Sequence, residues 1–206
     1  MTGRTRLTVI LSLAAIVLLG VVAADMVLRG PGQMGDGTPV RSSGQALVGG
    51  PFTLTDQDGR RVTPADYRGK YLLIYFGYTF CPDVCPAELQ VMTAALDIVG
   101  DKAEKIQALF ITIDPARDTV AQMKDYIGNF HKRFAALTGS AGDIAKAAKA
   151  YRVYYKKVAA EDGSNDYLMD HSSIVYLMDR SNKFLVHFPY GTGPEKMAAG
   201  IEKFVK

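Results

Sequence analysis

The fold is decided by residues 71–86, which read YLLIYFGYTFCPDVCP. Tyr71–Phe76 is a continuous apolar run, as is typical of a central β-strand that is covered on both faces. The only two cysteines of the chain, Cys81 and Cys85, follow this run closely. After them, apolar residues recur at helical spacing: Leu89, Met92, Leu96 and Val99. The cysteines are therefore expected where a strand meets the start of a helix, a place that stabilises a thiolate.

The segments on either side of this stretch extend it into an α/β pattern. Two short runs flank a turn sequence, as in a β-hairpin, and further runs have the apolar spacing of buried strands and helices. The hairpin strands are Phe52–Thr55 and Arg60–Thr63; the later strands are Ile106–Ile113, Ser173–Met178 and Phe184–Phe188; the helices cover Met123–Phe130, Asp143–Ala150 and Pro194–Phe204. This order predicts a thioredoxin-like fold with an N-terminal β-hairpin extension and a central helix–strand insertion.

The amino terminus is apolar and carries no charge over Leu7–Ala24, after Arg4 and Arg6. As a helix, these residues would span about 27 Å, which is marginally enough to cross a bilayer. The arginines are expected to stay on the cytoplasmic side, which places the rest of the chain on the outer side. We therefore expect residues 1–24 to form a transmembrane anchor, and the alternative interpretation is a cleaved signal peptide.

Composition separates a linker from a folded domain in the remaining chain, and it argues against a nucleic-acid-binding protein and a disulfide-rich scaffold. Residues 25–46 are rich in glycine and proline and predict a flexible linker, which leaves residues 47–206 as the folded domain. The 24 basic and 21 acidic residues of the 206 form no dense basic run, so we expect no binding to nucleic acid. Two cysteines can form only one disulfide within the chain, which excludes a disulfide-rich scaffold.

The spacing of Cys81 and Cys85 is compatible with three kinds of chemistry. The pair could form one stabilising disulfide, although a bridge across so few residues constrains the unfolded chain little. It could also act as a redox dithiol, because a low thiol pKa at a helix start favours exchange. Finally, two thiolates at this spacing can converge on one metal ion. The spacing alone does not decide among these possibilities.

Three segments, taken together, resemble a known family. Tyr75–Pro86 closely resembles the signature of the Sco/SenC family of copper proteins. The segments Asp114–Thr119 and Asp166–Ser172 resemble further motifs of that family, in the expected order. The resemblance covers roughly residues 47–206. It implies a thioredoxin-like domain on a membrane tether that binds one copper ion, as Cu(I) or Cu(II).

The resemblance also implies a site and a function. The ligands of the family map onto Cys81, Cys85 and His171. The implied function is that of a copper metallochaperone for the binuclear copper centre of cytochrome c oxidase. The expected partner is subunit II of that oxidase or another copper-accepting assembly protein, in the bacterial periplasm or the mitochondrial intermembrane space. The alternative is a thiol–disulfide reductase in which Cys81 and Cys85 keep the subunit II cysteines reduced for metallation.

The residues themselves favour metal binding over general reductase chemistry. Two thiolates and one imidazole are a soft donor set that suits Cu(I) and can also hold Cu(II). Thioredoxin-type reductases carry two residues between their cysteines and a cis-proline at the second loop, whereas this chain has three residues there and no proline beside His171. That second loop is expected to face the cysteines, so that all three donors can meet.

Several other polar or sulfur-bearing residues are expected to lie outside the ligand set. We expect Met169 to pack, His131 to be solvated at a helix end, and His187 to line the outer face of a strand. The carboxylates of Asp114 and Asp118 match the family motif but are not expected to bind copper. The aromatic residues near the motifs could shield the metal or belong to the core: Tyr78, Phe80 and Tyr167.

Overall fold

The computed structural model of the protein describes residues 48–159 and 167–206. The chain divides into two units, residues 1–45 and 46–206, and every described residue belongs to the second unit. The predicted anchor and linker, residues 1–46, lie outside the described residues. Within the described ranges, none of the helices is both long enough and apolar enough to cross a membrane.

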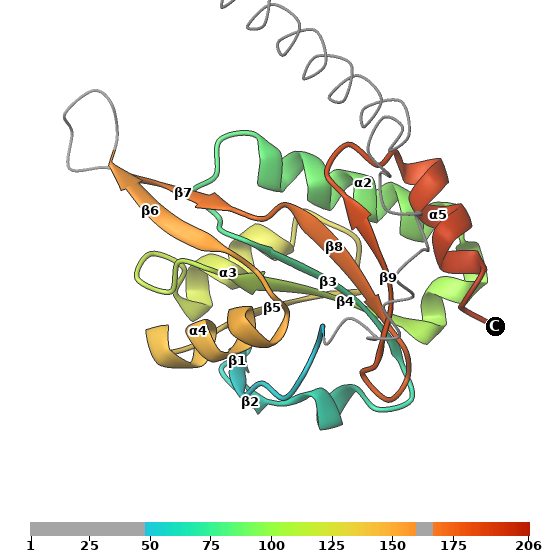
Figure 1. Ribbon diagram of the computed structural model, residues 1–206, viewed down its shortest axis with the longest axis horizontal. Coiled ribbons are helices and arrows are strands. Elements are labelled where there is room, and N and C mark those ends of the chain that lie inside the picture. The colour runs from blue at the N-terminus through green and yellow to red at the C-terminus, as the bar shows by residue number, and fades with distance from the viewer. Residues whose placement is uncertain (1–47, 160–166) are drawn as a thin grey trace, which may run out of the picture. The chain divides into compact units, whose positions relative to one another are not determined.

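A seven-stranded sheet forms the body of the domain, in the order β2-β1-β5-β4-β3-β8-β9 (Figure 1). Its strands are β1 (Leu54–Asp56), β2 (Arg61–Val62), β3 (Tyr71–Gly77), β4 (Ile106–Thr112), β5 (Phe134–Thr138), β8 (Ile174–Met178) and β9 (Phe184–Pro189). Strand β3 pairs in parallel with β4 and antiparallel with β8. Its continuous apolar sequence fits this internal position, because side chains on both of its faces are buried.

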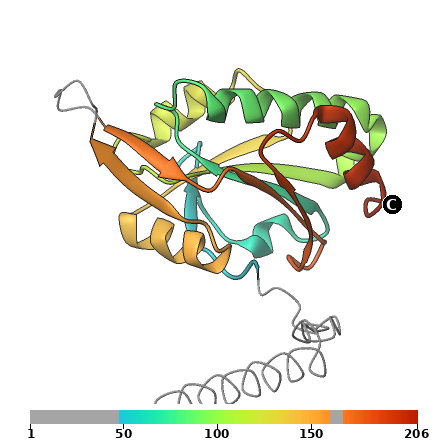
Figure 2. The same cartoon turned by 45° about the horizontal axis from the view of Figure 1, so that its top comes forward.

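Helices cover both faces of the sheet. They are η1 (Pro64–Tyr67), α2 (Val84–Ile98), η2 (Gly100–Lys105), α3 (Val120–Ile127), α4 (Ala141–Ala150) and α5 (Pro194–Glu202). Helices α2 and α5 pack together on one face, and α4 lies on the other (Figure 2). Alternation along β3 turns Tyr75 toward α2, while the ring of Phe76 packs on Tyr151 with centroids 5.5 Å apart. This arrangement confirms the predicted α/β thioredoxin-like fold.

The predicted N-terminal hairpin is present, and it forms part of the main sheet. Strands β1 and β2 pair antiparallel with Leu54 opposite Val62, as the turn sequence indicated. The Asp56 carboxylate accepts hydrogen bonds from two backbone amides of the turn, and Gly59 has a φ of +81°, which favours glycine. Because β1 also pairs with β5, through Thr55 opposite Thr138, the hairpin continues the main sheet.

Strands β6 (Tyr155–Ala159) and β7 (Tyr167–His171) form a separate two-stranded antiparallel sheet. This hairpin projects beyond the end of the main sheet (Figure 1). Tyr155 lies opposite His171 in the pairing register. The expectation of a loop at His171 is therefore wrong in detail: pairing with β6 makes His171 the last residue of a strand.

Candidate metal centre

Cys81 and Cys85 lie at the junction of β3 and α2, as predicted. Cys81 precedes the helix and is partly exposed, whereas Cys85 is the second residue of α2 and is 0% exposed. The side chain of the helix N-cap residue, Asp83, makes no capping hydrogen bond. Instead, the backbone N–H of Cys85 donates to the sulfur of Cys81, at 3.4 Å. The Cys81 sulfur thus occupies the position of an anion at a helix N-terminus.

The two thiols have opposite tendencies to ionise. The pKa of Cys81 is lowered, chiefly by a hydrogen bond from the Cys85 thiol and against the effect of burial, with further help from backbone N–H groups. The pKa of Cys85 is raised by the same hydrogen bond and by burial. One proton is therefore retained on the buried Cys85, and the thiolate forms on the accessible Cys81. Both residues are free cysteines in this structure.

His171 places its imidazole against the buried cysteine. The Nε2 atom lies 3.5 Å from the Sγ atom of Cys85, and Nδ1 lies 3.2 Å from the carbonyl oxygen of Ser172. Burial lowers the pKa of His171, which favours the neutral ring. A carbonyl can only accept, so a neutral ring donates from Nδ1 and leaves the lone pair of Nε2 directed toward the Cys85 sulfur.

The structure brings the three predicted ligands into one neighbourhood through two contacts, one from Cys85 to His171 and one from Cys85 to Cys81. Within residues 48–159 and 167–206, however, no group of three or more His, Cys, Asp or Glu side chains is placed to hold a metal ion. The contacts therefore bring the three side chains together without defining a coordination sphere.

A buried tyrosine on β3, absent from the predicted site, contacts the cysteine. The hydroxyl oxygen of Tyr75 lies 3.7 Å from the sulfur of Cys85 and 3.3 Å from the hydroxyl oxygen of Ser173. Gly77, on the same face of β3, leaves room for this sulfur, since a Cβ atom there would lie 3.0 Å from it. The period-two alternation of strand side chains could have indicated both residues, because the face of β3 toward α2 must meet the start of that helix.

A groove of about 380 Å³ opens over Cys81. One wall is the loop before α2 with the first residue of that helix, and the other is the β6–β7 hairpin. The lining is mostly apolar and includes both Cys81 and His171; the remaining lining residues are Tyr78, Pro82, Asp83, Val84, Val158, Leu168, Met169, Asp170 and Ser173. Met169 packs against the core, in agreement with the sequence prediction. An incoming molecule can therefore approach Cys81 through a largely apolar opening.

The carboxylates of the Asp114–Thr119 motif are occupied by protein groups. Asp118 is buried and accepts hydrogen bonds from the backbone and hydroxyl of Thr79 and from the hydroxyl of Thr112. Asp114 forms an ion pair with Arg117 at 2.5 Å. These contacts give the motif a structural role beside the cysteine loop.

The other two histidines lie away from the cysteines. His187 is exposed on β9, as predicted. His131 follows α3, but its side chain is only 14% exposed and Nδ1 accepts from the backbone of Arg133. The prediction of a solvated His131 is therefore wrong, because a turn folds the ring back onto its own backbone.

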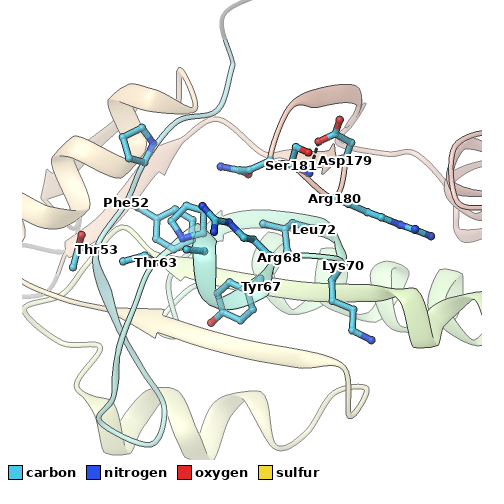
Figure 3. Close-up of a pocket in the computed structure, with 14 residues that line it drawn as sticks. Phe52, Thr53, Thr63, Tyr67, Arg68, Lys70, Leu72, Asp179, Arg180 and Ser181 are labelled. Carbon is cyan, nitrogen blue, oxygen red and sulfur yellow. Dashed lines mark hydrogen bonds between the residues drawn. The ribbon is translucent and has the colours of Figure 1, made fainter.

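A second hollow, of about 630 Å³, lies at the opposite end of β3 (Figure 3). The apolar side chains of Phe52 and Leu72 line it, together with the basic residues Arg68, Lys70 and Arg180. No cysteine or histidine is among its lining residues. The larger hollow is therefore separate from the sulfur chemistry at the other end of the strand.

The sequence of this chain is similar to one family model and to relatives that share the name SCO1. A sequence model described as SCO1/SenC matches residues 40–206. Protein SCO1 homolog 1, mitochondrial, of Arabidopsis thaliana is 40% identical over 166 residues, which are 80% of this chain and 49% of the relative. Protein SCO1 homolog, mitochondrial, of Homo sapiens is 41% identical over 163 residues, which are 78% of this chain and 54% of the relative. The chain thus spans about half the length of these two relatives.

Two solved structures are similar over the described domain. Arabidopsis thaliana ScoI with copper bound superposes with a TM-score of 0.72 at 41% identity, covering 76% of this chain and 96% of the other. Bradyrhizobium japonicum ScoI with copper bound gives a TM-score of 0.69 at 46% identity, covering 76% of this chain and 99% of the other.

Proposed function

The chain belongs to the SCO1/SenC family, and we propose that it is a copper metallochaperone for the assembly of cytochrome c oxidase. In this proposal Cys81, Cys85 and His171 bind one copper ion as cargo. The observation that carries it is the 3.5 Å contact between the Cys85 sulfur and the His171 imidazole, with the second cysteine in the same loop. Two thiols and a neutral imidazole are a soft donor set that suits copper. Two solved structures of similar proteins contain bound copper.

The unequal exposure of the two sulfurs suits transfer of the ion. Cys85 is fully buried and remains with the domain, while Cys81 lines the open groove. A thiol or imidazole of an acceptor can therefore replace Cys81 without unfolding the site. The acceptor in this proposal is subunit II of the oxidase, where the ion enters the binuclear copper centre, or another copper-accepting assembly protein.

The proposed location follows from the apolar amino terminus. Residues 7–24 have the length and composition of a membrane span, and the preceding arginines favour an outward-facing domain. Residues 25–46 then act as the tether. The curated relatives include proteins named as mitochondrial, so the outer compartment is either the mitochondrial intermembrane space or the bacterial periplasm.

Competition for Cu(I) against a chromophoric chelator tests the proposal on the reduced full chain in mild detergent. We expect one Cu(I) per chain, with a large loss of affinity in Cys81→Ser and Cys85→Ser and a smaller loss in His171→Ala. His187→Ala is the matched control, because that imidazole is exposed on β9. Undiminished affinity in either cysteine variant would refute the proposed site, and undiminished affinity in His171→Ala would remove the histidine from it.

A second candidate function is reduction of the oxidase cysteines by Cys81 and Cys85. The observation that favours it is the lowered pKa of the partly exposed Cys81 beside a protonated Cys85, since a thiolate with an adjacent thiol is the arrangement for disulfide exchange. Exchange with a subunit II peptide disulfide would then require both cysteines and survive His171→Ala. If His171→Ala abolished oxidase assembly in cells while exchange remained intact, reduction would not be the main function.

A further inference from the structure

Arg117 joins three segments that are distant in sequence but adjacent to the cysteine loop. It lies between β4 and α3, and its Nε atom donates to the Asp114 carboxylate at 2.5 Å. Its Nη1 atom donates to the backbone carbonyl of Tyr167, the first residue of β7, at 3.0 Å. The Tyr167 hydroxyl donates to the other carboxylate oxygen of Asp114 at 2.9 Å. These three bonds form a closed ring, the Asp114–Arg117–Tyr167 cluster.

Aromatic rings surround the same guanidinium. Its central carbon lies 3.6 Å from the ring centroid of Tyr167, 4.8 Å from that of Phe80 and 5.7 Å from that of Tyr78. Phe80 and Tyr78 belong to the loop that leads into Cys81. The Tyr78 hydroxyl in turn accepts a hydrogen bond from the backbone N–H of Met169 on β7, at 3.2 Å. The cluster therefore connects the start of β7 to the cysteine loop.

The cluster contains an unsatisfied polar group. The Nη2 atom of Arg117 is buried and has no hydrogen-bond partner among the described residues. A buried donor without a partner destabilises the folded state, so the bonds to Asp114 and Tyr167 and the surrounding rings must offset this cost to keep Arg117 in place.

The cluster lies at the start of β7, a strand that does not pair with any strand of the main sheet in the described residues. Within the part of the chain that the structure describes, β7 pairs only with β6. Its last residue, His171, is separated from β8 by two residues, whereas its first residue is held against the cysteine loop by the side-chain contacts of the cluster. Tyr167, Met169 and His171 alternate onto one face of the strand. The same face thus carries the Arg117 contacts at its first residue and the imidazole at its last.

We propose that Arg117 is a positioning residue for the metal site: with Asp114 it fixes the start of β7 and so holds His171 against Cys85. This inference deepens the proposed function and rests on it. Within the part of the chain that the structure describes, Arg117 makes no hydrogen bond to either cysteine. Its role is to hold the strand in a position from which the imidazole reaches the sulfur without further ordering when copper arrives.

Two measurements on the full chain in mild detergent test the inference. The first is hydrogen exchange of the reduced, copper-free protein. Arg117→Gln should raise the exchange of β6 and β7 amides about tenfold, while the amides of β3, β4 and β8 remain unchanged. The second is Cu(I) competition, in which Arg117→Gln should weaken binding about tenfold. In the His171→Ala background, Arg117→Gln should cause no further loss, because the residue acts through the imidazole.

Arg133 provides a matched control. Its side chain is 20% exposed against 19% for Arg117, it pairs with Glu104, and it also has a buried nitrogen without a partner. Arg133→Gln should change neither hairpin exchange nor copper affinity. If Arg117→Gln does not fold, Tyr167→Phe provides the test, since it removes only the hydroxyl bond to Asp114 and should raise hairpin exchange by a smaller factor.

The outcomes separate this inference from the proposed function. Unchanged β6–β7 exchange in both Arg117→Gln and Tyr167→Phe would overturn the inference, even if the protein binds copper. Additive losses of affinity in the Arg117→Gln and His171→Ala double variant would also overturn it. A wild-type chain that fails to bind Cu(I) would instead refute the proposed function, and the exchange measurement would still show whether Arg117 positions the hairpin.

Discussion

Replacing Glu88 with glutamine should stabilise the folded protein by an amount that grows as the pH rises from about 4.5 to about 7. Glu88 lies on α2, one turn beyond Cys85, and is only 2% exposed. Its Oε1 atom has no hydrogen-bond partner within the described ranges. Burial alone raises the pKa of this carboxyl group from 4.5 to about 7. An ionised carboxylate at this position therefore costs the folded state free energy.

The size and sign of the effect follow from the difference in pKa between the folded and unfolded states. Below pH 4.5 the carboxyl is protonated in both states, and the folded state carries no penalty. As the pH rises, the unfolded chain loses its proton first, so stability falls until the folded group also ionises near pH 7. Because one pKa unit is worth about 1.4 kcal/mol, the shift from 4.5 to about 7 makes the penalty above pH 7 at most about 3.5 kcal/mol.

Urea denaturation of the reduced, copper-free protein at several pH values from 4.5 to 8 measures this effect. The difference in unfolding free energy between Glu88→Gln and wild type should be small at pH 4.5 and grow toward pH 7, with the variant more stable. Glu195→Gln, an exposed glutamate on α5, should leave the pH dependence unchanged. Parallel curves for Glu88→Gln and wild type would show that the buried carboxyl is stabilised by a group that the structure does not reveal.

Three further predictions concern the residues around the sulfurs. At pH 7 iodoacetamide should modify Cys81 well before Cys85, because Cys81 is partly exposed and has the lowered pKa; equal rates in peptide mass spectra would contradict this. Tyr75→Phe should cost about 1 kcal/mol in urea denaturation, since it leaves Cys85 and Ser173 without the tyrosine hydroxyl; unchanged stability would mean that this contact is not formed. Gly77→Ala should cost about 1–3 kcal/mol, because the new Cβ would lie 3.0 Å from the Cys85 sulfur, and a midpoint equal to wild type would argue against this packing.

The sequence predicts best the elements that carry their own periodic pattern. The apolar run of β3 and the helical spacing of Leu89 and Met92 each appear in a window of a few residues, and the structure confirms both. The bonds at the start of α3 carry no such pattern: the Thr119 hydroxyl accepts from the backbone N–H of Gln122, while the Gln122 side chain donates to Thr79.

The features that the sequence does not predict depend on distant partners. Strand β6 is mostly exposed and contains Lys156 and Lys157, so it lacks an apolar alternation and becomes a strand only by pairing with β7. The contact of Arg117 with Tyr167 joins residues 50 positions apart. Such contacts leave no local pattern in the sequence.

The separation of the β6–β7 hairpin from the main sheet bears on how quickly a bound ion could leave. In the part of the chain that the structure describes, no strand pairing joins the two sheets, so His171, as a proposed ligand, could move with the hairpin without breaking a strand pairing of the main sheet. The barrier to dissociation then depends on a few side-chain contacts at the hairpin and not on the cooperative unfolding of the domain. Substitutions that raise the melting temperature through the core should therefore leave the off-rate of the ion unchanged, and evolution could adjust residence time and thermal stability independently.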